Sequence, residues 1–288
     1  MADKADVKAS TVVKGRKSIA YLQKCKDEGT KIVQMCPMVR DHFQVMAAEM
    51  AGVDVCRSTI PMAGDESIPV QMGQHEYWIH VIRSVAKTIH LNWFMVTPQY
   101  STAENAINWG SRLTFVGADS LLPMGITNDV LKAMSDNWIV TFGHIGALSG
   151  WQTNAQGGYK RCGKTAEDAM KIFKMGYEYQ ENGMKAMSVE LTPIEVSNAI
   201  AKKLRVPVIG IAAGGACDGS EMVDFDLFDI MPSAASHAKA YANFWDWATT
   251  AYMDWADDVR DGVYPEDKHG YHMDPEELAK FEDAIAKF

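Results

Sequence analysis

The sequence predicts an α/β protein built as a single (β/α)₈ TIM barrel with a C-terminal helical extension. Short apolar runs alternate with amphipathic helical segments, the runs number eight, and no linker or internal repeat divides the chain. Most runs lack a regular polar and apolar alternation, which is typical of strands covered on both faces. We therefore expect one domain over 1–288, with an N-terminal arm at 1–17 and a C-terminal helix and tail at 233–288. An open doubly wound sheet is the alternative.

The eight predicted strands are, in chain order, KIVQMCPM (31–38), VDVCRST (53–59), HLNWFMVT (90–97), SLLPM (120–124), WIVTFGHIG (138–146), KAMSVEL (185–191), VPVIGIAAG (206–214) and DLFDIMP (226–232). Two helices between them have clear start signals. The helix over 165–183 has Thr165 as its N-cap, and the helix over 192–204 has Thr192 as its cap and Pro193 at its first helical position. A last helical pattern over 233–260 is rich in aromatic residues, which indicates a core or subunit contact.

Charge and composition exclude several classes of protein. The formal net charge of −9 argues against nonspecific nucleic-acid binding, which needs a basic surface. The N-terminal MADKADVKAS lacks the apolar region of a secretory signal, and we find no apolar run of roughly 18 residues that would cross a membrane. The five cysteines form no C-x-x-C pair, which favours a reducing compartment. We expect a cytoplasmic enzyme that acts on a small molecule.

The segment GYKRCGKT (158–165) matches the phosphate-binding pattern G-x-x-x-x-G-K-[ST]. In a nucleotide-binding protein this loop links a strand directly to a helix. Here a polar stretch, ALSGWQTNAQG, precedes it, so we interpret the segment as the end of a long loop after the strand over 138–146. Loops at this end of a barrel strand bind substrates and close over them.

Several motifs resemble the ketopantoate hydroxymethyltransferase family of the phosphoenolpyruvate mutase and isocitrate lyase superfamily. The motifs are GHIGALSGW, GGYKRCGKT, SVELTP, VPVIGIAAGGACDG and GVYPEDKHGYH, and the resemblance runs from about residue 20 to residue 272. It implies a (β/α)₈ barrel, a homo-oligomer, and transfer of the one-carbon unit of 5,10-methylenetetrahydrofolate to C3 of 3-methyl-2-oxobutanoate, on the route to pantothenate.

The resemblance also implies roles for individual residues. The reaction removes a proton α to a ketone and therefore needs a base. The family's catalytic base falls on Glu190. The histidine of the family's motif falls on His144, in GHIGALSGW. Both residues lie at the ends of predicted strands. Tyr159 and Lys160 belong to the GGYK loop and are expected to bind substrate. Structural alternatives remain, namely a capping or ion-pairing role for the glutamate and a purely structural histidine.

The chain departs from the family at its metal site. Family members hold Mg²⁺ on three carboxylates, which fall here on Ile60, Val96 and Met124, and a substrate-binding lysine falls on Leu122. Apolar side chains offer no oxygen to a hard dication, so we expect that Mg²⁺ is not bound at these positions. A rebuilt site using Asp65, Glu66 or Asp119 is the alternative.

The same changes alter the expected substrate pocket. Arg57 and Ser58 near the end of the second strand are candidates for holding a substrate carboxylate, because an arginine fork suits that group; for Arg57 a surface salt bridge is the alternative. Val96 and Met124 would line an apolar mouth. Further candidates for that lining are Met62, Met95, Trp93 and Trp151.

Three functions follow from these observations. The first is the family's transfer reaction with Glu190 as base. The second is a metal-independent one-carbon transferase or C–C lyase acting on a more apolar substrate. The third is a noncatalytic binding paralogue, which the combination of Glu190, His144 and the GGYK loop disfavours.

Overall fold

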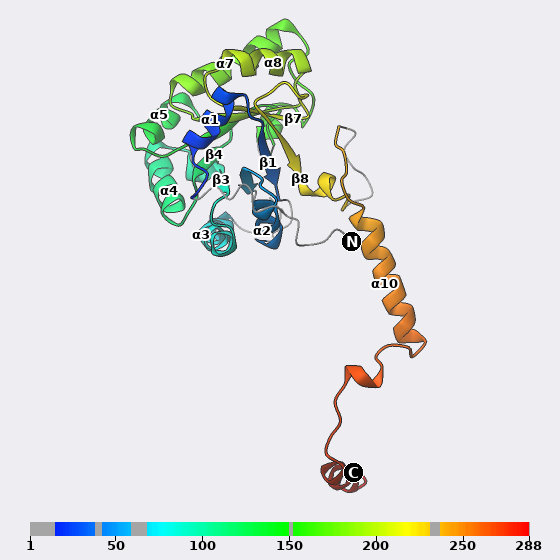
Figure 1. Cartoon of the computed structure of the whole chain (residues 1–288). Coiled ribbons are helices and arrows are strands. Elements are labelled where there is room, and N and C mark those ends of the chain that lie inside the picture. The colour runs from blue at the N-terminus through cyan, green and yellow to red at the C-terminus, as the bar shows by residue number, and fades with distance from the viewer. Residues whose placement is uncertain (1–14, 38–41, 59–67, 150–151, 231–236, 288) are drawn as a thin grey trace.

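Eight parallel strands form a nearly closed barrel, which confirms the predicted fold class (Figure 1). The computed structural model describes residues 15–37, 42–58, 68–149, 152–230 and 237–287, and the backbone alone for residues 58 and 68–73. Neighbouring strands follow the order β4-β3-β2-β1-β8-β7-β6-β5. A bridge between Leu121 and Thr141 brings the two ends of the sheet together. The strands are β1 (Ile32–Cys36), β2 (Val55–Ser58), β3 (His90–Met95), β4 (Ser120–Pro123), β5 (Phe142–Gly146), β6 (Ala186–Glu190), β7 (Val208–Ile211) and β8 (Gly219–Val223).

Most of the helices surround the sheet on its outer side or close one end of it, and the last two α-helices extend away from the barrel (Figure 1). The α-helices are α1 (Ile19–Glu28), α2 (His42–Met50), α3 (Ile68–Val85), α4 (Ala103–Phe115), α5 (Asn128–Asp136), α6 (Gln152–Ala155), α7 (Ala166–Glu181), α8 (Ile194–Lys203), α9 (Asp224–Leu227), α10 (Phe244–Arg260) and α11 (Pro275–Ile285). Two short 3₁₀ helices are η2 (Thr97–Gln99) and η3 (Asp267–His269).

Helix starts only partly follow the predicted caps. Thr165 caps α7 by accepting from the backbone N–H of Asp168 at 3.2 Å, as predicted. Helix α8 begins one residue later than predicted, because Pro193 occupies its N-cap position and no side-chain cap bond forms there. The hydroxyl of Thr192 is therefore not used as a cap.

The last strand was predicted in the wrong place. The structure puts β8 at Gly219–Val223, where the sequence GSEMV mixes polar and apolar residues. The apolar run predicted as a strand from residue 226 instead contains the end of α9 and the turn after it. Helix α10 also begins later than the predicted 233, at Phe244.

The barrel interior is layered by polarity. At its N-terminal end, Leu22 and Cys25 of α1 pack against an apolar layer, so α1 closes that end. Above this layer the inward positions of six strands carry polar side chains. The apolar layer consists of Ile32, Val55, Phe142, Ala186 and Ile209, and the buried polar residues above it include Gln34, Arg57, Asn92, His144, Ser188 and Glu221.

The outer ring of helices is incomplete beside β1 and β8. The loop after β7 contains no helix, and β8 is followed only by the four-residue α9. Val33, which points outward from β1, is 51% exposed, and Ser220 on the neighbouring β8 is also exposed. Helix α10 does not cover this face, since it runs away from the barrel (Figure 1).

The join between β1 and β8 gives a stability prediction. A Cβ on Gly219 would overlap the backbone carbonyl of Ile32, which the paired strand holds in place. Gly219→Ala should lower the free energy of unfolding by about 1–3 kcal/mol, the usual cost of overpacking, measured by urea denaturation. Gly215→Ala is the matched control, because nothing lies within 4 Å of its Cβ position. Equal stability of the two variants would contradict the strand register described here.

Candidate active site

Two neighbouring strands bring Glu190 and His144 together at the C-terminal mouth of the barrel. In the parallel pairing of β5 with β6, Gly146 lies opposite Glu190 and His144 opposite Ser188. Gly146 has φ 87°, and a Cβ there would overlap the carbonyl of Glu190. Only glycine therefore lets the β5 turn approach β6 this closely. The close approach is held by the N–H of Ala147, which donates to that carbonyl at 3.0 Å.

Glu190 is a buried carboxylate with two hydrogen-bond donors. Its side chain lies 2.8 Å from His144 through Oε2 and Nε2, and the hydroxyl of Tyr159 donates to Oε1. Burial raises the pKa of Glu190, but the hydrogen bonds from His144 and Tyr159 and the charge of Arg57 outweigh burial and lower the pKa below its ordinary value. The carboxylate is therefore ionised at neutral pH and can accept a proton.

Arg57 determines the tautomer of His144. Its Nη1 lies 3.0 Å from Nδ1 of the imidazole, and a guanidinium can only donate. Nδ1 must therefore accept, and the ring proton lies on Nε2. That N–H faces Oε2 of Glu190 and the carbonyl of Ala147, which is 3.0 Å away. Through this N–H, His144 donates a hydrogen bond to the carboxylate of Glu190.

A buried ion pair holds Arg57 inside the barrel. Arg57 is 3% exposed, and its Nη1 lies 3.2 Å from the carboxylate of Glu221 on β8. Its Nη2 donates to Ser188, and the amide of Gln34 donates to the same Glu221 carboxylate. Burial raises the pKa of Glu221, and the charge of Arg57 opposes that rise. Removing either partner of such a pair leaves a charge buried, which costs about 3–5 kcal/mol.

Sequence reasoning missed three members of this network. Gln34 and Ser188 are single polar residues inside apolar strand runs, at positions that point into the barrel, and this parity was a usable signal. Glu221 was missed because its segment was not predicted to be a strand. Arg57 was expected to hold substrate, with a surface salt bridge as the alternative; it lies in the interior, and its terminal nitrogens contact protein groups.

An apolar cluster fills another part of the mouth. Phe94, Leu122, Met124 and Leu148 are buried together, with Val96 packed against them. This cluster contains two of the three positions at which the family resemblance places a carboxylate, Val96 and Met124, and the position of its lysine, Leu122. Val96 and Met124 therefore lie among apolar side chains, and their substrate-lining role stays a prediction.

Two predicted lining residues lie elsewhere. Trp93 and Met95 alternate with the inward-facing residues of β3 and pack in the layer between strands and helices. Trp93 Nε1 donates to His75 Nδ1 on α3 at 2.8 Å. Their assignment to the mouth was wrong, because it ignored the two-residue period of the strand. Met62 and Trp151 lie outside the described residues.

The remaining predicted site residues are scattered. Lys160 is exposed, and its Nζ lies 3.4 Å from the carbonyl of Gly157. Ser58 ends β2, but its side chain is not described. Asp119 precedes β4 at the opposite end of the barrel, where Arg83 and the N–H of Leu91 bind it.

The described residues do not fit a Mg²⁺ ion. They contain no group of three or more His, Cys, Asp or Glu side chains that could hold a metal. Val96 and Met124 supply no oxygen ligand, and Asp119 is at the wrong end of the barrel. Ile60, Asp65 and Glu66 lie outside the described residues.

The fold and site together define a (β/α)₈ barrel with a buried, hydrogen-bonded carboxylate at its mouth, and comparison with known proteins gives the family. The family model described as ketopantoate hydroxymethyltransferase matches residues 16–267. The chain belongs to this family, and its relatives are enzymes of the transferase class.

Individual relatives agree with this membership. A 3-methyl-2-oxobutanoate hydroxymethyltransferase 1 of Methylibium petroleiphilum is 29% identical over 292 residues, covering 98% of each chain. A 3-methyl-2-oxobutanoate hydroxymethyltransferase of Nitrosopumilus maritimus is 28% identical over 254 residues, covering 85% of this chain and 91% of its own. The solved structure of 2,3-dimethylmalate lyase, a PEP mutase/isocitrate lyase superfamily member, shares the fold with a TM-score of 0.53 at 12% identity, covering 93% of this chain and 98% of that one. Among the described helices, none has the length and apolar character needed to cross a membrane.

The hydrogen bond from Tyr159 gives a prediction for the pKa of Glu190. Tyr159→Phe removes a donor that stabilises the carboxylate, so the pKa of Glu190 should rise. The measurement is a ¹³C NMR titration of protein labelled on glutamate side chains, with the Glu190 signal assigned by its loss in Glu190→Gln. Tyr177→Phe on α7 is the matched control and should leave the titration unchanged. A Glu190 signal that titrates identically in wild type and Tyr159→Phe would contradict the contact.

Proposed function

We propose that the protein transfers a hydroxymethyl group to C3 of a 2-oxo acid, with 3-methyl-2-oxobutanoate as the substrate and 5,10-methylenetetrahydrofolate as the one-carbon donor. The observation that carries this proposal is the ionised, buried Glu190 held by His144 and Tyr159 at the barrel mouth. The names of the relatives support the same reaction.

In the proposed reaction Glu190 accepts the proton from C3, and the C3–H bond breaks. The electron pair left on C3 forms a bond to the methylene carbon of the donor as one of its two carbon–nitrogen bonds breaks, and the released nitrogen takes the proton that Glu190 accepted. Water then displaces the second nitrogen from this carbon and supplies the hydroxyl oxygen, a water proton goes to that nitrogen, and tetrahydrofolate leaves. His144 keeps its Nε2 proton directed at Glu190, so the carboxylate is held in one orientation while it receives the substrate proton.

The apolar cluster favours a second candidate. Leu122, Met124 and Val96 put hydrocarbon where the family resemblance places charged groups, and Phe94 and Leu148 pack with them on one side of the mouth. A substrate with a larger apolar part would bury that part against this cluster. The second candidate is therefore a one-carbon transfer or C–C cleavage on a more apolar substrate, again with Glu190 as the base.

Deuterium exchange tests the base directly. Wild-type protein incubated with 3-methyl-2-oxobutanoate in D₂O should exchange the C3 proton for deuterium. The loss of the C3 proton signal is measured by ¹H NMR. Glu190→Gln should slow this exchange by about 10²–10⁴-fold, the usual contribution of a general base. Glu195→Gln, an exposed glutamate on α8, is the matched control and should exchange at the wild-type rate.

The same assay separates the candidates. Exchange should persist in EDTA, because the described residues do not fit a metal. Exchange that requires added Mg²⁺ would show that oxygen ligands come from residues outside the described ranges. No exchange with or without Mg²⁺ would reject this 2-oxo acid and leave the more apolar substrate.

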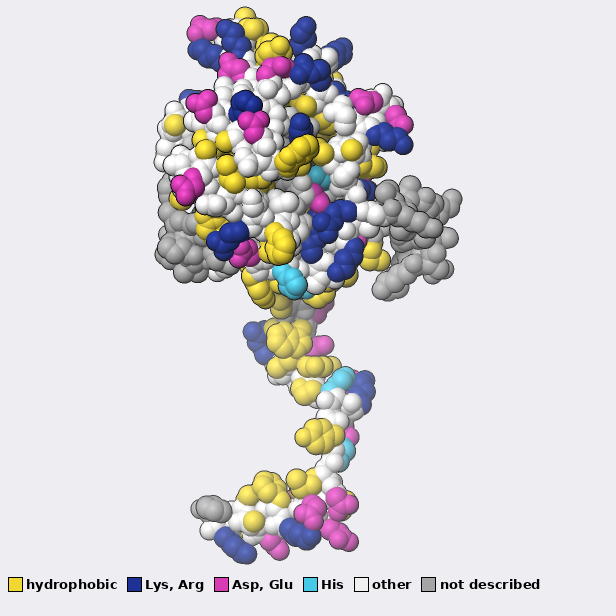
Figure 2. Space-filling view, turned by 90° about the vertical axis from the view of Figure 1, so that its left-hand side faces the viewer, with side chains coloured by type: hydrophobic (Ala, Val, Ile, Leu, Met, Phe, Trp, Pro, Cys, Tyr) yellow, Lys and Arg dark blue, Asp and Glu magenta, His cyan; other side chains and the backbone are white. Residues whose placement is uncertain are grey.

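We also propose that α10 packs against a second copy of the chain. Its residues are almost all exposed, among them large apolar side chains, and a helix in water depends on packing for its stability. Figure 2 shows hydrophobic side chains along the extension that leaves the barrel. The exposed apolar residues of α10 are Phe244, Trp245, Trp247, Tyr252, Met253, Trp255 and Val259. Among the described residues, no helix covers the outer face of β1 and β8.

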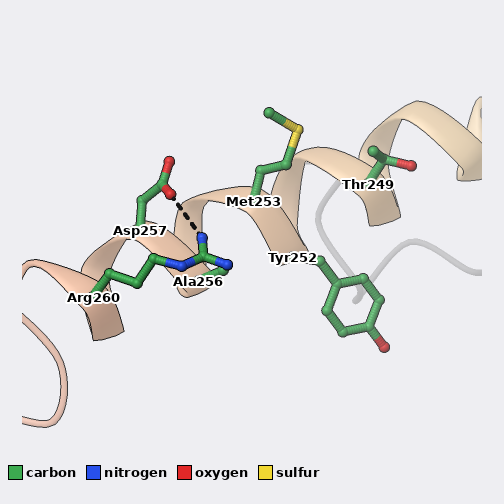
Figure 3. Close-up of a pocket in the computed structure, with 6 residues that line it drawn as sticks. All are labelled: Thr249, Tyr252, Met253, Ala256, Asp257 and Arg260. Carbon is green, nitrogen blue, oxygen red and sulfur yellow. Dashed lines mark hydrogen bonds and ion pairs between the residues drawn. The ribbon is translucent and has the colours of Figure 1, made fainter.

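A hollow of about 420 Å³ on α10 fits this interpretation. All its lining residues come from this one helix, with Arg260 reaching back to Asp257 at 3.2 Å (Figure 3). A hollow with walls from a single helix is open to solvent and suits a packing partner better than a small substrate.

Sedimentation tests this contact. The wild-type chain of 31.9 kDa should sediment as an oligomer, and the double variant Trp247→Glu/Trp255→Glu should sediment as a smaller species, because two charges would be buried in the interface. Trp138→Glu is the control: Trp138 is 92% exposed in the turn between α5 and β5, far along the chain from α10. A monomeric wild-type protein would refute the proposal.

A further inference from the structure

A proton that Glu190 takes from a substrate must leave the site before the carboxylate can act again. Glu190 is only 8% exposed, so its carboxylate has little direct access to bulk water. Among the described residues, two side chains form hydrogen bonds with this carboxylate, His144 at Oε2 and Tyr159 at Oε1. These two contacts are therefore the candidate paths for the proton, and they lead in opposite directions.

The contact with His144 leads into the barrel. His144 is 2% exposed, its Nε2 proton faces Glu190, and its Nδ1 lies 3.0 Å from Nη1 of Arg57. Because a guanidinium only donates, the imidazole has no vacant nitrogen on which to take up a proton from Glu190. Arg57 is bound in turn to Ser188 and Glu221 in the interior. In the described part of the chain, this path does not connect Glu190 with solvent.

The contact with Tyr159 leads outward. The phenolic hydroxyl donates to Oε1 of Glu190, while Tyr159 as a whole is 52% exposed. A phenolic hydroxyl can both donate and accept a hydrogen bond. The oxygen that donates to the carboxylate can therefore accept from the carboxylic acid once Glu190 is protonated. Tyr159 thus joins the buried carboxylate to the surface of the barrel mouth.

The loop holds Tyr159 in this position from both sides. Before it, Gly158 has φ 106°, a conformation that favours glycine. After it, the N–H of Cys162 donates at 3.0 Å to the carbonyl of Leu191, the residue that follows Glu190. This bond attaches the loop to the end of β6, so the phenol and the carboxylate are held beside each other by the backbone as well as by their own contact.

Tyr159 can pass on a proton without becoming a base itself. Burial and the negative charges of Glu190, Asp226 and Glu221 raise the pKa of the Tyr159 phenol. The hydroxyl therefore keeps a hydrogen at neutral pH. It has to gain one hydrogen as it loses another, so that no phenolate forms.

We propose that Tyr159 carries the substrate proton between Glu190 and the outside of the site. This inference rests on the proposed function, because it requires Glu190 to accept the proton from C3. The proton on Oε1 passes to the oxygen of Tyr159, and the original hydroxyl hydrogen of Tyr159 passes to water at the mouth. Glu190 returns to a carboxylate and Tyr159 to a neutral phenol, so one proton leaves and no electrons are transferred. In the complete transfer reaction, the released nitrogen of the donor takes the proton in place of water.

Proton exchange at saturating 3-methyl-2-oxobutanoate in D₂O, measured over a series of pH values, tests this role. Tyr159→Phe should lower the exchange rate about 10²-fold, the lower end of the usual contribution of a positioned proton-transfer group. The loss should persist on the plateau above the pKa of Glu190. A hydroxyl that only lowers this pKa would move the pH profile and leave the plateau rate unchanged. Tyr177→Phe on α7 is the matched control and should exchange at the wild-type rate.

Isotopes at C3 identify the step that has slowed. The release of deuterium and of tritium from labelled substrate into H₂O is compared for each protein. In wild type, tritium should leave more slowly than deuterium, because breaking of the bond at C3 limits the rate. Without the hydroxyl of Tyr159, the isotope held on Glu190 should return to C3 many times before it escapes. The ratio of the deuterium rate to the tritium rate should therefore fall toward one in Tyr159→Phe.

Three results for Tyr159→Phe would overturn the proposal: a plateau rate equal to wild type, a change in KM alone, or a slower plateau with the isotope ratio of wild type. The second result would assign Tyr159 to substrate binding, and the third would assign it to the bond-breaking step. Circular dichroism checks that the fold is intact. Wild-type protein that exchanges no C3 proton would reject the proposed base together with this role. Equal exchange by wild type and Tyr159→Phe would retain the base and reject the proton carrier alone.

Discussion

The contact between the Arg57 guanidinium and His144 Nδ1 is the interaction on which the candidate active site depends. Because the guanidinium can only donate, the imidazole proton is confined to Nε2 and directed at Glu190. Arg57 in turn needs the carboxylate of Glu221, since a lone charge inside a barrel would be strongly destabilising. One chain of contacts thus runs across the barrel from β8 through β2 and β5 to the end of β6, and the charge of Arg57 helps to keep the proposed base ionised.

The fold was predictable because its main determinant is local. Strands buried on both faces need continuous apolar runs, and seven of the eight runs lie where the structure has strands. The prediction of the eighth strand was wrong because this strand is not a continuous apolar run. The inward positions of β8 include a charged residue, Glu221, whose partner is distant in sequence, so its run does not look like a buried strand. The apolar run after it belongs to a short helix and a turn.

The positions of Glu190 and His144 at the candidate site were predictable, because a sequence motif marks the end of each strand. Residues whose contacts come from distant parts of the chain were harder to predict. Strand parity assigns Trp93 and Met95 to the outer layer, and neglect of that parity explains their misplacement at the mouth. Arg57, Ser188 and Glu221 contact one another although they are 33 to 164 residues apart in the chain, and the pattern of a single sequence does not record such contacts. The hydroxyl of Thr192, which has no hydrogen-bond partner among the described residues, was likewise not predictable, since its sequence context indicates a helix cap.

The loop between β5 and α7 connects two parts of the site through the chain itself. Tyr159 donates to Glu190, and Arg161, only two residues further on, lines a neighbouring pocket of about 350 Å³. If the position of Arg161 is coupled to the hydrogen bond made by Tyr159, protonation of Glu190 changes the affinity of this pocket by the same factor as occupancy of the pocket changes the proton affinity of Glu190. The affinity of the pocket would then depend on pH.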